Sequence, residues 1–362
     1  MKIFLIAGAR PNFMKIAPIA RAFDNCQDQI EYKIVHTGQH YDANMSNVFF
    51  EELGIRNPDY HLGAGGGSHA QQTAKIMTGF EEICEKDRPD LVIVVGDVNS
   101  TLACSIVAKK LCIEVAHVEA GLRSFDLSMP EEINRMVTDS ISDLFFVTEE
   151  QGLENLVKEG KPQEKIHFVG HVMIDNLFFQ LKKLESMDTV SFPTSEFKKV
   201  HKEYGVVTLH RPSNVDDKKT LERIFNTLNQ ISENLPLIFP IHPRTRKNME
   251  AFNITPGSNI ELTELLSYME FLNLWKDSRM ALTDSGGLQE ETTALGIPCL
   301  TIRENTERPI TVTQGTNELM GTSKEKMITS FEKILSNFWK TGQKPQFWDG
   351  RAAERIVKVI CQ

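Results

Sequence analysis

Short apolar runs alternate with longer amphipathic stretches along the whole sequence, and this alternation limits the fold more than any other feature. Several of the apolar runs are continuous Val, Ile, Leu and Phe segments. Strands look like this when helices cover both faces of a parallel sheet. The stretches between them carry helical periodicity. The sequence therefore predicts repeated βαβ units and an α/β fold built on parallel sheets.

Eleven strands are expected, which is more than one open sheet comfortably holds. A chain of 362 residues also suggests about two domains at roughly 150 residues each. We therefore expect two doubly wound domains. The expected strands are Lys2–Ala7, Glu31–His36, Leu91–Val95, Ile113–Val118, Leu144–Thr148, Ile166–Val169, Gly205–Leu209, Leu237–Ile241, Asn259–Leu262, Met280–Thr283 and Pro298–Ile302.

The expected domain boundary lies where a helix-like stretch, Ile174–Leu184, runs into the polar segment Glu185–Pro193. We expect a first domain of residues 1–172 with 350–362, and a second of residues 173–349. The last helix, Ala352–Ile360, would then pack back on the first domain. Ligands of such folds bind at the carboxyl ends of strands, so the site is expected in a cleft between the domains.

The charge balance excludes whole classes of partner. With 40 Lys and Arg against 49 Asp and Glu, the net charge is −9. A general nucleic-acid or anionic-membrane binder needs a basic surface instead. A local basic pocket for a small phosphorylated ligand remains compatible with this charge.

The cysteines and the first residues bear on compartment. The six cysteines form no Cys-x-x-Cys pair and no zinc-type spacing, which favours reduced structural thiols. The first apolar run is too short for a signal peptide or a membrane span. We therefore expect a cytoplasmic protein.

A basic pair opens the first expected helix. Arg10 and Lys15 lie in the segment Gly8–Pro18, directly after the first strand. Cations at a helix N-terminus oppose the helix dipole, so this pair makes better sense if an anion joins it. The segment has neither the G-x-G-x-x-G fingerprint nor a Walker A motif, so no nicotinamide or ATPase loop is indicated.

Three acids form the candidate proton-transfer group. Asp97 ends the most apolar strand, Glu119 directly follows another, and Glu131 lies just after Pro130. Clustered carboxylates raise one another's pKa, which suits proton transfer. Asp97 could instead cap a helix, and Glu131 could be an ordinary first-turn acid. The segment around them is rich in charge, with His117, Arg123, Asp126, Glu132 and Arg135.

The second domain offers a candidate diphosphate loop. Ser285, Gly286 and Gly287 follow a strand and open a helix, where free backbone N–H groups could hold a diphosphate. Glu291, one turn later, could bind both hydroxyls of a ribose. The alternative is an ordinary helix start with acids in its first turns.

Other candidate groups lie at further strand ends of the sequence. In the second domain these are His210, Arg211, Arg303 and Arg308. In the first domain, His36, Gln39, His40 and Asp42 could bind a sugar or a second ligand. No third metal ligand is evident beside the two histidines, so no metal site is expected.

Eight motifs in order resemble the non-hydrolysing UDP-N-acetylglucosamine 2-epimerase family from residue 3 to about 360. They are GARP…K, GQHYDANM, GDVNST, HVEAGLRS, MPEEINR, LHRPSN, DSGGLQEE and TERPITV. The resemblance implies a GT-B-like architecture of two Rossmann-like domains, a homodimer, a UDP-sugar substrate, and neither metal nor other cofactor.

The resemblance also implies roles for individual residues. It gives the catalytic carboxylates as Asp97, Glu119 and Glu131, and places His210 near the leaving diphosphate. The substrate-binding residues that it implies are Arg10 and Lys15 near the diphosphate and sugar, Ser285, Gly286 and Gly287 in the diphosphate loop, Glu291 at the ribose, and Arg308.

The implied reaction interconverts UDP-GlcNAc and UDP-ManNAc. UDP leaves, a 2-acetamidoglucal forms, and UDP adds back after protonation from the other face. Such chemistry needs an acid–base group on each face of the sugar and cations that hold UDP. The alternatives are a UDP-2,3-diacetamido-2,3-dideoxyglucuronate 2-epimerase, hydrolytic release of the sugar, or a GT-B glycosyltransferase.

Three stretches depart from the commonest form of the family. They are GARPNF, HTGQHYDANMS at 36–46, and HPRTR at 242–246. These variants look closer to relatives that act on the diacetamido-uronate or on 6-deoxy sugars. Arg244 could bind a uronate carboxylate, or it could be an ordinary surface residue.

Overall fold

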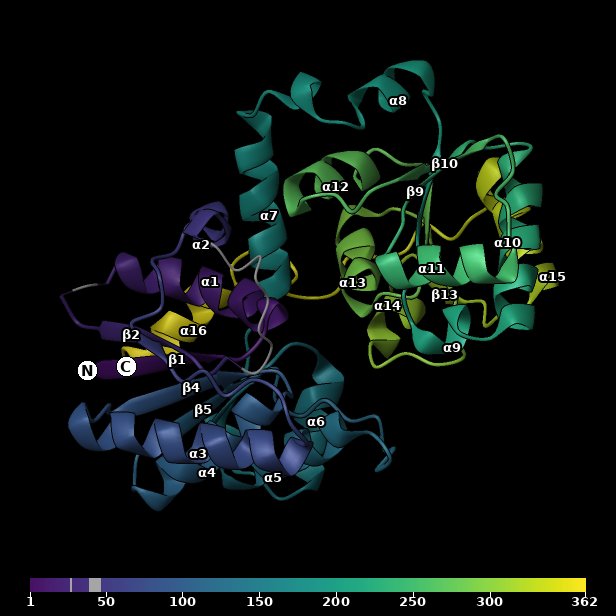
Figure 1. The fold of residues 1–362 in the computed structure, drawn as a ribbon. Coiled ribbons are helices and arrows are strands. Elements are labelled where there is room, and N and C mark those ends of the chain that lie inside the picture. The colour runs from purple at the N-terminus through teal and green to yellow at the C-terminus, as the bar shows by residue number, and fades with distance from the viewer. Residues whose placement is uncertain (27, 39–46) are drawn as a thin grey trace. The chain divides into compact units, whose positions relative to one another are not determined.

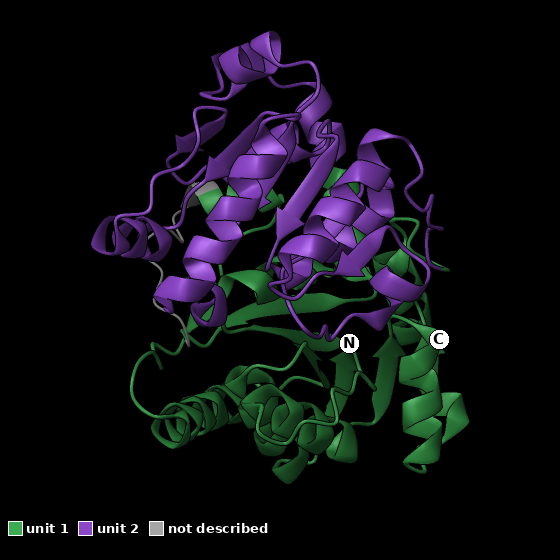
Figure 2. Cartoon of the chain, turned by 90° about the vertical axis from the view of Figure 1, so that its right-hand side faces the viewer, with its two compact units in different colours: residues 1–179, 346–362 green, residues 180–345 purple. Residues whose placement is uncertain are grey.

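The computed structural model describes residues 1–26, 28–38 and 47–362 (Figure 1). The chain divides into two compact units, coloured separately in Figure 2. Unit 1 comprises residues 1–179 and 346–362, and unit 2 comprises residues 180–345. Each unit contains one sheet with interleaved helices, and every strand pairing described is parallel.

Unit 1 has a seven-stranded sheet in the order β3-β2-β1-β4-β5-β6-β7. The chain order reverses between β1 and β4, which makes this pair the switch point of a doubly wound sheet. The strands are β1 (Lys2–Ala7), β2 (Glu31–His36), β3 (Tyr60–His61), β4 (Leu91–Val95), β5 (Glu114–Val118), β6 (Leu144–Val147) and β7 (Ile166–Phe168).

The helices of unit 1 follow its strands in alternation. They are α1 (Arg10–Asp24), α2 (Asn47–Leu53), α3 (His69–Lys86), α4 (Asn99–Lys110), α5 (Pro130–Ile141), α6 (Glu150–Lys158), the short 3-10 helix Gln163–Lys165, α7 (Val172–Glu185), which continues into unit 2 after residue 179, and α16 (Ala352–Ile360). The last of these, α16, returns to unit 1 and packs against α1. The Asp175 carboxylate holds its start by accepting hydrogen bonds from Ala352 N at 3.0 Å and Ala353 N at 2.7 Å.

Unit 2 repeats the same plan with six strands in the order β10-β9-β8-β11-β12-β13. Its switch point lies between β8 and β11. Its strands are β8 (Gly205–Thr208), β9 (Leu237–Pro240), β10 (Ile260–Thr263), β11 (Met280–Thr283), β12 (Cys299–Thr301) and β13 (Asn317–Leu319). Its helices are the 3-10 helix Thr189–Ser191, α8 (Ser195–Val200), α9 (Pro212–Val215), α10 (Lys218–Ser232), α11 (Pro243–Phe252), α12 (Tyr268–Trp275), α13 (Gly286–Leu295), α14 (Pro309–Thr313) and α15 (Lys324–Leu335).

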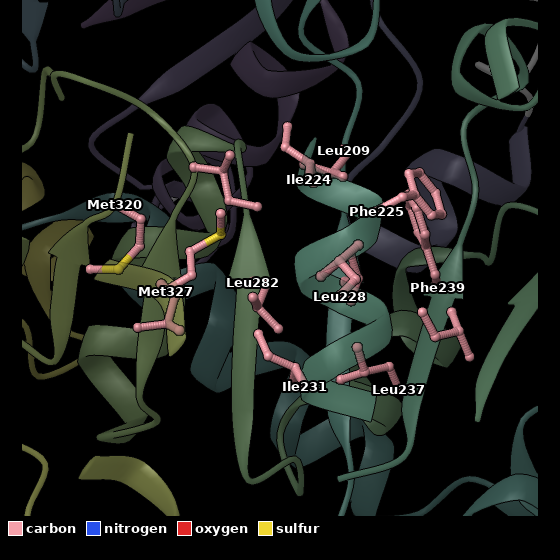
Figure 3. Packing of buried hydrophobic residues seen from close by; sticks show 14 of the residues in the cluster. Leu209, Ile224, Phe225, Leu228, Ile231, Leu237, Phe239, Leu282, Met320 and Met327 are labelled. Carbon is pink, nitrogen blue, oxygen red and sulfur yellow. The ribbon is translucent and has the colours of Figure 1, made fainter. Parts of the chain in front are cut away.

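The core of unit 2 shows why the sequence forms these layers. Helix α10 buries Ile224, Leu228 and Ile231, which recur at helical spacing and therefore share one face. That face packs toward Leu237 of β9 and Leu282 of β11 (Figure 3). Burial on both faces explains why such strands read as continuous apolar runs.

The expected α/β fold with two doubly wound sheets is confirmed. Four strands, β1, β2, β4 and β11, have the bounds that the sequence predicts. Two short edge strands, β3 and β13, were not predicted, because two or three residues are too few to show a hydrophobic periodicity. Among the described helices, none has both the length and the apolar composition needed to cross a bilayer.

Candidate active site

The residues singled out in the sequence follow the strands that flank the two switch points. Ligands of doubly wound sheets bind outside the carboxyl ends of strands at such points. In unit 1, Arg10 and Lys15 follow β1, Asp97 follows β4, and Glu119 follows the neighbouring strand β5. In unit 2, His210 follows β8, and Ser285, Gly286 and Gly287 follow β11.

Glu119 is a buried carboxylate held in an uncommon backbone conformation. Its φ of +70° lies in the left-handed region, which costs energy for a residue with a side chain. Its N–H donates to the carbonyl of Phe146, 3.0 Å away. Its Oε2 accepts a hydrogen bond from Lys15 Nζ at 2.5 Å, and His171 Nδ1 lies 3.9 Å from its Oε1. The strand end thus fixes a carboxylate beside an ammonium group.

The Lys15–Glu119 ion pair occupies the space that a side chain at position 96 would need. Gly96 follows β4 with φ +66°, and a Cβ there would lie 2.8 Å from Lys15 Nζ and 3.6 Å from Glu119 Oε2. Only glycine combines the left-handed backbone with such a close approach. The turn after β4 therefore lies directly against the Lys15–Glu119 pair.

Asp97, the next residue, pairs with an arginine from α5. Arg135 Nη1 lies 2.6 Å from Asp97 Oδ2, and Arg135 Nη2 lies 2.9 Å from Glu132 Oε2. Burial by itself would raise the pKa of Glu132. The hydrogen bonds from the N–H groups of Ser124 and Phe125 and the charge of Arg135 have the larger effect, so the pKa of Glu132 is lowered overall. Arg135 therefore bridges a buried anion and the partly exposed Asp97.

Glu131 is the third acid of the expected proton-transfer group. It is exposed at the start of α5, and the described contacts join it to neither Asp97 nor Glu119. The convergence of the three carboxylates stays a prediction. The sequence pattern did not distinguish Glu131 from Glu132, its buried neighbour.

His117 and Arg123, from the charged segment, form a buried network with Asp139, which the sequence pattern did not indicate. His117 Nε2 lies 2.8 Å from Gly96 O, and His117 Nδ1 lies 2.6 Å from Asp139 Oδ1. Arg123 Nη1 lies 2.7 Å from Asp139 Oδ2. Burial opposes ionisation of Asp139, but His117 and Arg123 lower its pKa overall. The network ties the loops after β4 and β5 together.

Arg10, the other basic residue of the first segment, remains exposed. Its guanidinium lies 5.3 Å from the centroid of the Phe49 ring. The two cations expected beside an anion therefore differ, because Lys15 already neutralises Glu119 whereas Arg10 faces solvent. Their roles in binding a diphosphate remain predictions.

The expected diphosphate loop opens α13 in unit 2. Ser285 is the N-cap residue and makes no side-chain capping bond, while its N–H donates to Thr283 Oγ1 at 2.9 Å. A Cβ at Gly286 would lie 2.9 Å from Glu307 Oε1, whereas a Cβ at Gly287 would meet nothing within 4 Å. The first turn thus has an open side at Gly287.

The basic residues near this loop already have acidic partners. Arg308 Nε lies 2.5 Å from Glu290 Oε1, and Arg303 Nη2 lies 2.7 Å from Glu307 Oε2. Burial raises the pKa of Glu307, but Arg303 and Arg308 lower it to about 2. Arg308 therefore lies near the expected diphosphate loop, and its guanidinium is paired with Glu290.

Glu291, the expected ribose-binding acid, is buried on α13. It accepts a hydrogen bond from Tyr268 Oη at 2.8 Å. Burial raises its pKa to about 7, assisted by Glu290 and opposed by the Tyr268 hydrogen bond. Tyr268 was not expected, because nothing in its local sequence links the start of α12 to α13.

His210 is tied to the end of β11. Its Nδ1 lies 2.8 Å from Asp284 Oδ1, and its side chain is 47% exposed. His242, from the variant segment 242–246, lies 6.4 Å away between ring centroids. Arg244 is exposed and paired with Asp216, so it already has a carboxylate partner at the surface.

The cluster expected after β2 is only partly described. Gln39, His40 and Asp42 lie outside the described residues. His36 Nδ1 lies 3.3 Å from His61 Nδ1, and burial together with His61 lowers the pKa of His36 to about 4. Within residues 1–26, 28–38 and 47–362, no group of three or more His, Cys, Asp or Glu side chains is placed to hold a metal ion.

Comparison with known proteins decides the family. A family model described as UDP-N-acetylglucosamine 2-epimerase matches residues 24–361. The chain belongs to this family. Members of the UDP-N-acetylglucosamine 2-epimerase family are isomerases, so the resemblance read from the eight motifs is confirmed.

Two curated relatives in this family cover nearly the whole chain. The UDP-N-acetylglucosamine 2-epimerase of Methanocaldococcus jannaschii is 44% identical over 99% of both chains. The UDP-2,3-diacetamido-2,3-dideoxy-D-glucuronate 2-epimerase of Pseudomonas aeruginosa is 40% identical over 100% of both chains. Over the whole chain, the identity to the UDP-N-acetylglucosamine 2-epimerase is thus slightly higher than the identity to the diacetamido-uronate enzyme.

A solved structure in the family supports the fold. The M. jannaschii UDP-GlcNAc 2-epimerase, solved in complex with UDP-GlcNAc and UDP, is similar with a TM-score of 0.86 and 44% identity. The match covers 99% of each chain. The expected GT-B-like, α/β fold of this family member is confirmed.

Proposed function

We propose that this protein is a non-hydrolysing UDP-N-acetylglucosamine 2-epimerase, with UDP-GlcNAc and UDP-ManNAc as its substrate pair. The observation that carries the proposal is the buried Lys15–Glu119 pair beside the turn after β4. A carboxylate fixed at a strand end is suited to remove or return a proton. The 44% identity to a UDP-GlcNAc 2-epimerase over the whole chain supports the choice of substrate.

The proposed reaction has two balanced halves. The hydrogen on carbon 2 of the sugar leaves as a proton while the bond between carbon 1 and the diphosphate breaks. The electron pair of the C–H bond forms the double bond of 2-acetamidoglucal, and UDP keeps the pair of the broken C–O bond. Protonation of carbon 2 from the other face and re-addition of UDP at carbon 1 give the epimer.

The proposal gives roles to residues of unit 1 and to residues of unit 2. We assign proton transfer to Asp97, Glu119 and Glu131 in unit 1. The assignment of UDP binding rests on the open first turn of α13 in unit 2 and on the buried Glu291. Groups fixed in advance lower the barrier because the protein need not reorganise around the developing charge.

A second candidate substrate is the diacetamido-uronate. The 40% identity to the P. aeruginosa enzyme favours it. The structure gives little support through Arg244, because Asp216 already pairs with that residue at the surface. We therefore rank this substrate behind UDP-GlcNAc.

One experiment tests both substrates. The protein is incubated in deuterated water with UDP-GlcNAc and, separately, with UDP-2,3-diacetamido-2,3-dideoxyglucuronate, and the sugar is followed by NMR. Deuterium at carbon 2 together with a growing manno product identifies the epimerase and its substrate. Absence of exchange with both compounds would refute the proposal and direct attention to 6-deoxy UDP-sugars and then to glycosyl transfer.

We also propose that the protein works as a homodimer. Large apolar side chains are exposed on α5 and the loop before it, including Phe125, Leu127, Ile133 and Met136. Large exposed apolar patches commonly mark interfaces, and these four side chains come from one helix and the loop that leads into it. Sedimentation analysis of the wild type and of Ile133→Glu tests this, since the charge should produce monomers. A monomeric wild type at micromolar concentration refutes it.

We further propose a cytoplasmic location. The six cysteines are all free, and Cys84, Cys104 and Cys299 are buried, as in proteins of reducing compartments. Cell fractionation with an antibody to the protein checks this. Recovery in an extracellular or membrane fraction would contradict it.

A further inference from the structure

Asp284 occupies a central place in unit 2 to which the proposed reaction assigns no role. It is the first residue after β11, at the switch point of the sheet, and it is fully buried. Its carboxylate receives hydrogen bonds from the side chain of His210, from the backbone N–H groups of His210 and Arg211, and from the side-chain amide of Asn214.

The two carboxylate oxygens of Asp284 share the backbone N–H of His210, which also lies 3.2 Å from Oδ1, and otherwise serve different partners. Oδ1 lies 2.8 Å from His210 Nδ1. Oδ2 accepts from Arg211 N at 2.9 Å, from His210 N at 3.0 Å, and from Asn214 Nδ2 at 3.1 Å. Oδ2 therefore anchors the loop after β8, while Oδ1 faces the imidazole.

The pairing fixes the proton on His210. A carboxylate oxygen only accepts hydrogen bonds, so His210 Nδ1 must carry a hydrogen. Burial opposes ionisation of Asp284, but the hydrogen bonds and charge of His210 and the two backbone N–H groups lower its pKa overall. The other ring nitrogen of His210, Nε2, belongs to a side chain that is about half exposed and is thus available to a ligand.

Among the described residues, Arg211 and Arg244 are cations on the elements next to this pair, and Glu307 lies 3.8 Å from Arg211 Nη2. Arg211 Nε donates to Asp284 O at 3.0 Å, and Arg244 follows His242 on α11. His242 Nδ1 accepts a hydrogen bond from Arg244 N at 3.2 Å, and burial, His210 and Arg244 lower the pKa of His242. Within the described part of the chain, Asp284 is thus the anion that pairs with the His210 ring.

We propose that Asp284 is a positioning residue, which orients the His210 imidazolium so that Nε2–H donates to the diphosphate as it leaves the sugar. This inference rests on the proposed function. It adds to that function the residue that holds the cation facing the leaving diphosphate in place. The proton of carbon 2 goes to a carboxylate of unit 1. The electron pair of the broken C–O bond stays on the diphosphate oxygen, whose new charge the imidazolium stabilises without a change in its own protonation.

The variant Asp284→Asn gives a prediction that loop damage alone would not produce. Arg211 N and Asn214 Nδ2 donate to Oδ2 alone, so the amide oxygen of Asn takes that place. Its NH₂ group then occupies the Oδ1 position and donates to His210 Nδ1. The ring proton must move to Nε2, leaving a neutral imidazole of the wrong tautomer.

The first measurement is ¹⁵N NMR of the full chain with labelled histidine, without substrate. We expect a protonated Nδ1 on His210 in the wild type and an unprotonated Nδ1 in Asp284→Asn. An unprotonated Nδ1 in the wild type overturns the proposal even if the variant does not fold. A protonated Nδ1 in a folded variant overturns it as well.

The second measurement is a double-mutant cycle with UDP-GlcNAc. We expect Asp284→Asn to lower kcat about 100-fold, the size of effect typical of one charge or proton-transfer group. Combining it with His210→Asn should cause no further loss, because Asp284 acts through the ring. An additional loss of kcat in the double variant overturns the proposal, since Asp284 would then act independently of His210.

Asn214→Ala is the matched control. It removes one hydrogen bond to the same Oδ2 and another to Ile302 O at 2.9 Å, so it loosens the same loop without touching the imidazole. We expect kcat within about fivefold of wild type, as for one lost hydrogen bond, and an unchanged tautomer. Equal effects of Asn214→Ala and Asp284→Asn would overturn the proposal. If the wild type turns over neither UDP-sugar, the proposed function fails, whereas the substrate-free NMR result still decides the role of Asp284.

Discussion

Lys15 Nζ lies 2.5 Å from Glu119 Oε2, although the two residues are 104 positions apart in the chain. The pair joins the second turn of α1 to the residue after β5, across the end of β4. Lys15 lies where a cation opposes the helix dipole, and the buried carboxylate of Glu119 compensates for that position. An acid that is both buried and paired with an ammonium group is a strong candidate for proton transfer.

We expect Glu119→Gln to lower turnover of UDP-GlcNAc by at least about 100-fold, because the amide cannot exchange a proton with the sugar. UDP affinity should stay within about tenfold of wild type, since the change does not touch the diphosphate-binding groups. Steady-state kinetics and calorimetric titration with UDP measure the two effects. Glu114→Gln, an exposed acid of the same strand, serves as the control and should retain activity. A large loss of UDP affinity in Glu119→Gln would contradict this assignment.

Gly96→Ala should separate crowding at the ion pair from backbone strain. The new Cβ would lie 2.8 Å from Lys15 Nζ at φ +66°, so the pair must move and turnover should fall more than about tenfold. Gly160→Ala is the matched control, because its φ is +79° and nothing lies within 4 Å. Both variants should lose about 1–2 kcal/mol of stability in urea titrations from the left-handed backbone. Equal kcat values for the two variants would show that the contact is not important.

The raised pKa of Glu291 predicts opposite pH trends for stability and binding. A carboxyl whose pKa rises from 4.5 to about 7 on folding stabilises the folded state fully below 4.5, and this contribution is lost as pH rises through 7. UDP affinity should rise over the same interval, because the ionised acid accepts both ribose hydroxyls.

Glu291→Gln removes the titrating group and should flatten both curves between pH 5 and 8. Urea unfolding and UDP titration across this range measure them, with Glu325→Gln, an exposed first-turn acid of α15, as control. A wild-type UDP affinity that does not change with pH would rule out Glu291 as a titrating ligand of the ribose.

Asp175→Ala should destabilise unit 1 by releasing the start of α16. The Asp175 carboxylate accepts from both Ala352 N and Ala353 N, and the loss of such a cap costs about 1–2 kcal/mol. Glu354→Ala changes an exposed acid in the first turn of the same helix and should cost less than about 0.5 kcal/mol. Urea titrations compare the two variants. Equal losses would show that the Asp175 cap contributes nothing specific.

The sequence by itself determined the class of fold and the places where chemistry could occur. Continuous apolar runs specify buried parallel strands, and the bounds of β1, β2, β4 and β11 follow from them. Polar residues that directly follow such runs, including Asp97, Glu119 and His210, were found for the same reason. Strand bounds and the residues that follow them depend on neighbouring residues in the chain, so they can be predicted from the sequence pattern.

Only the tertiary structure decided which of these residues meet. The partners of His210, Glu291 and His117 are Asp284, Tyr268 and Asp139, and none of these three was anticipated. Their pairing depends on strand order, which places β1 beside β4 and β8 beside β11 although other elements separate them in the chain. Burial then sets the charge of each group, as for Glu291, because the cost of desolvation depends on the surrounding fold and not on neighbours in sequence.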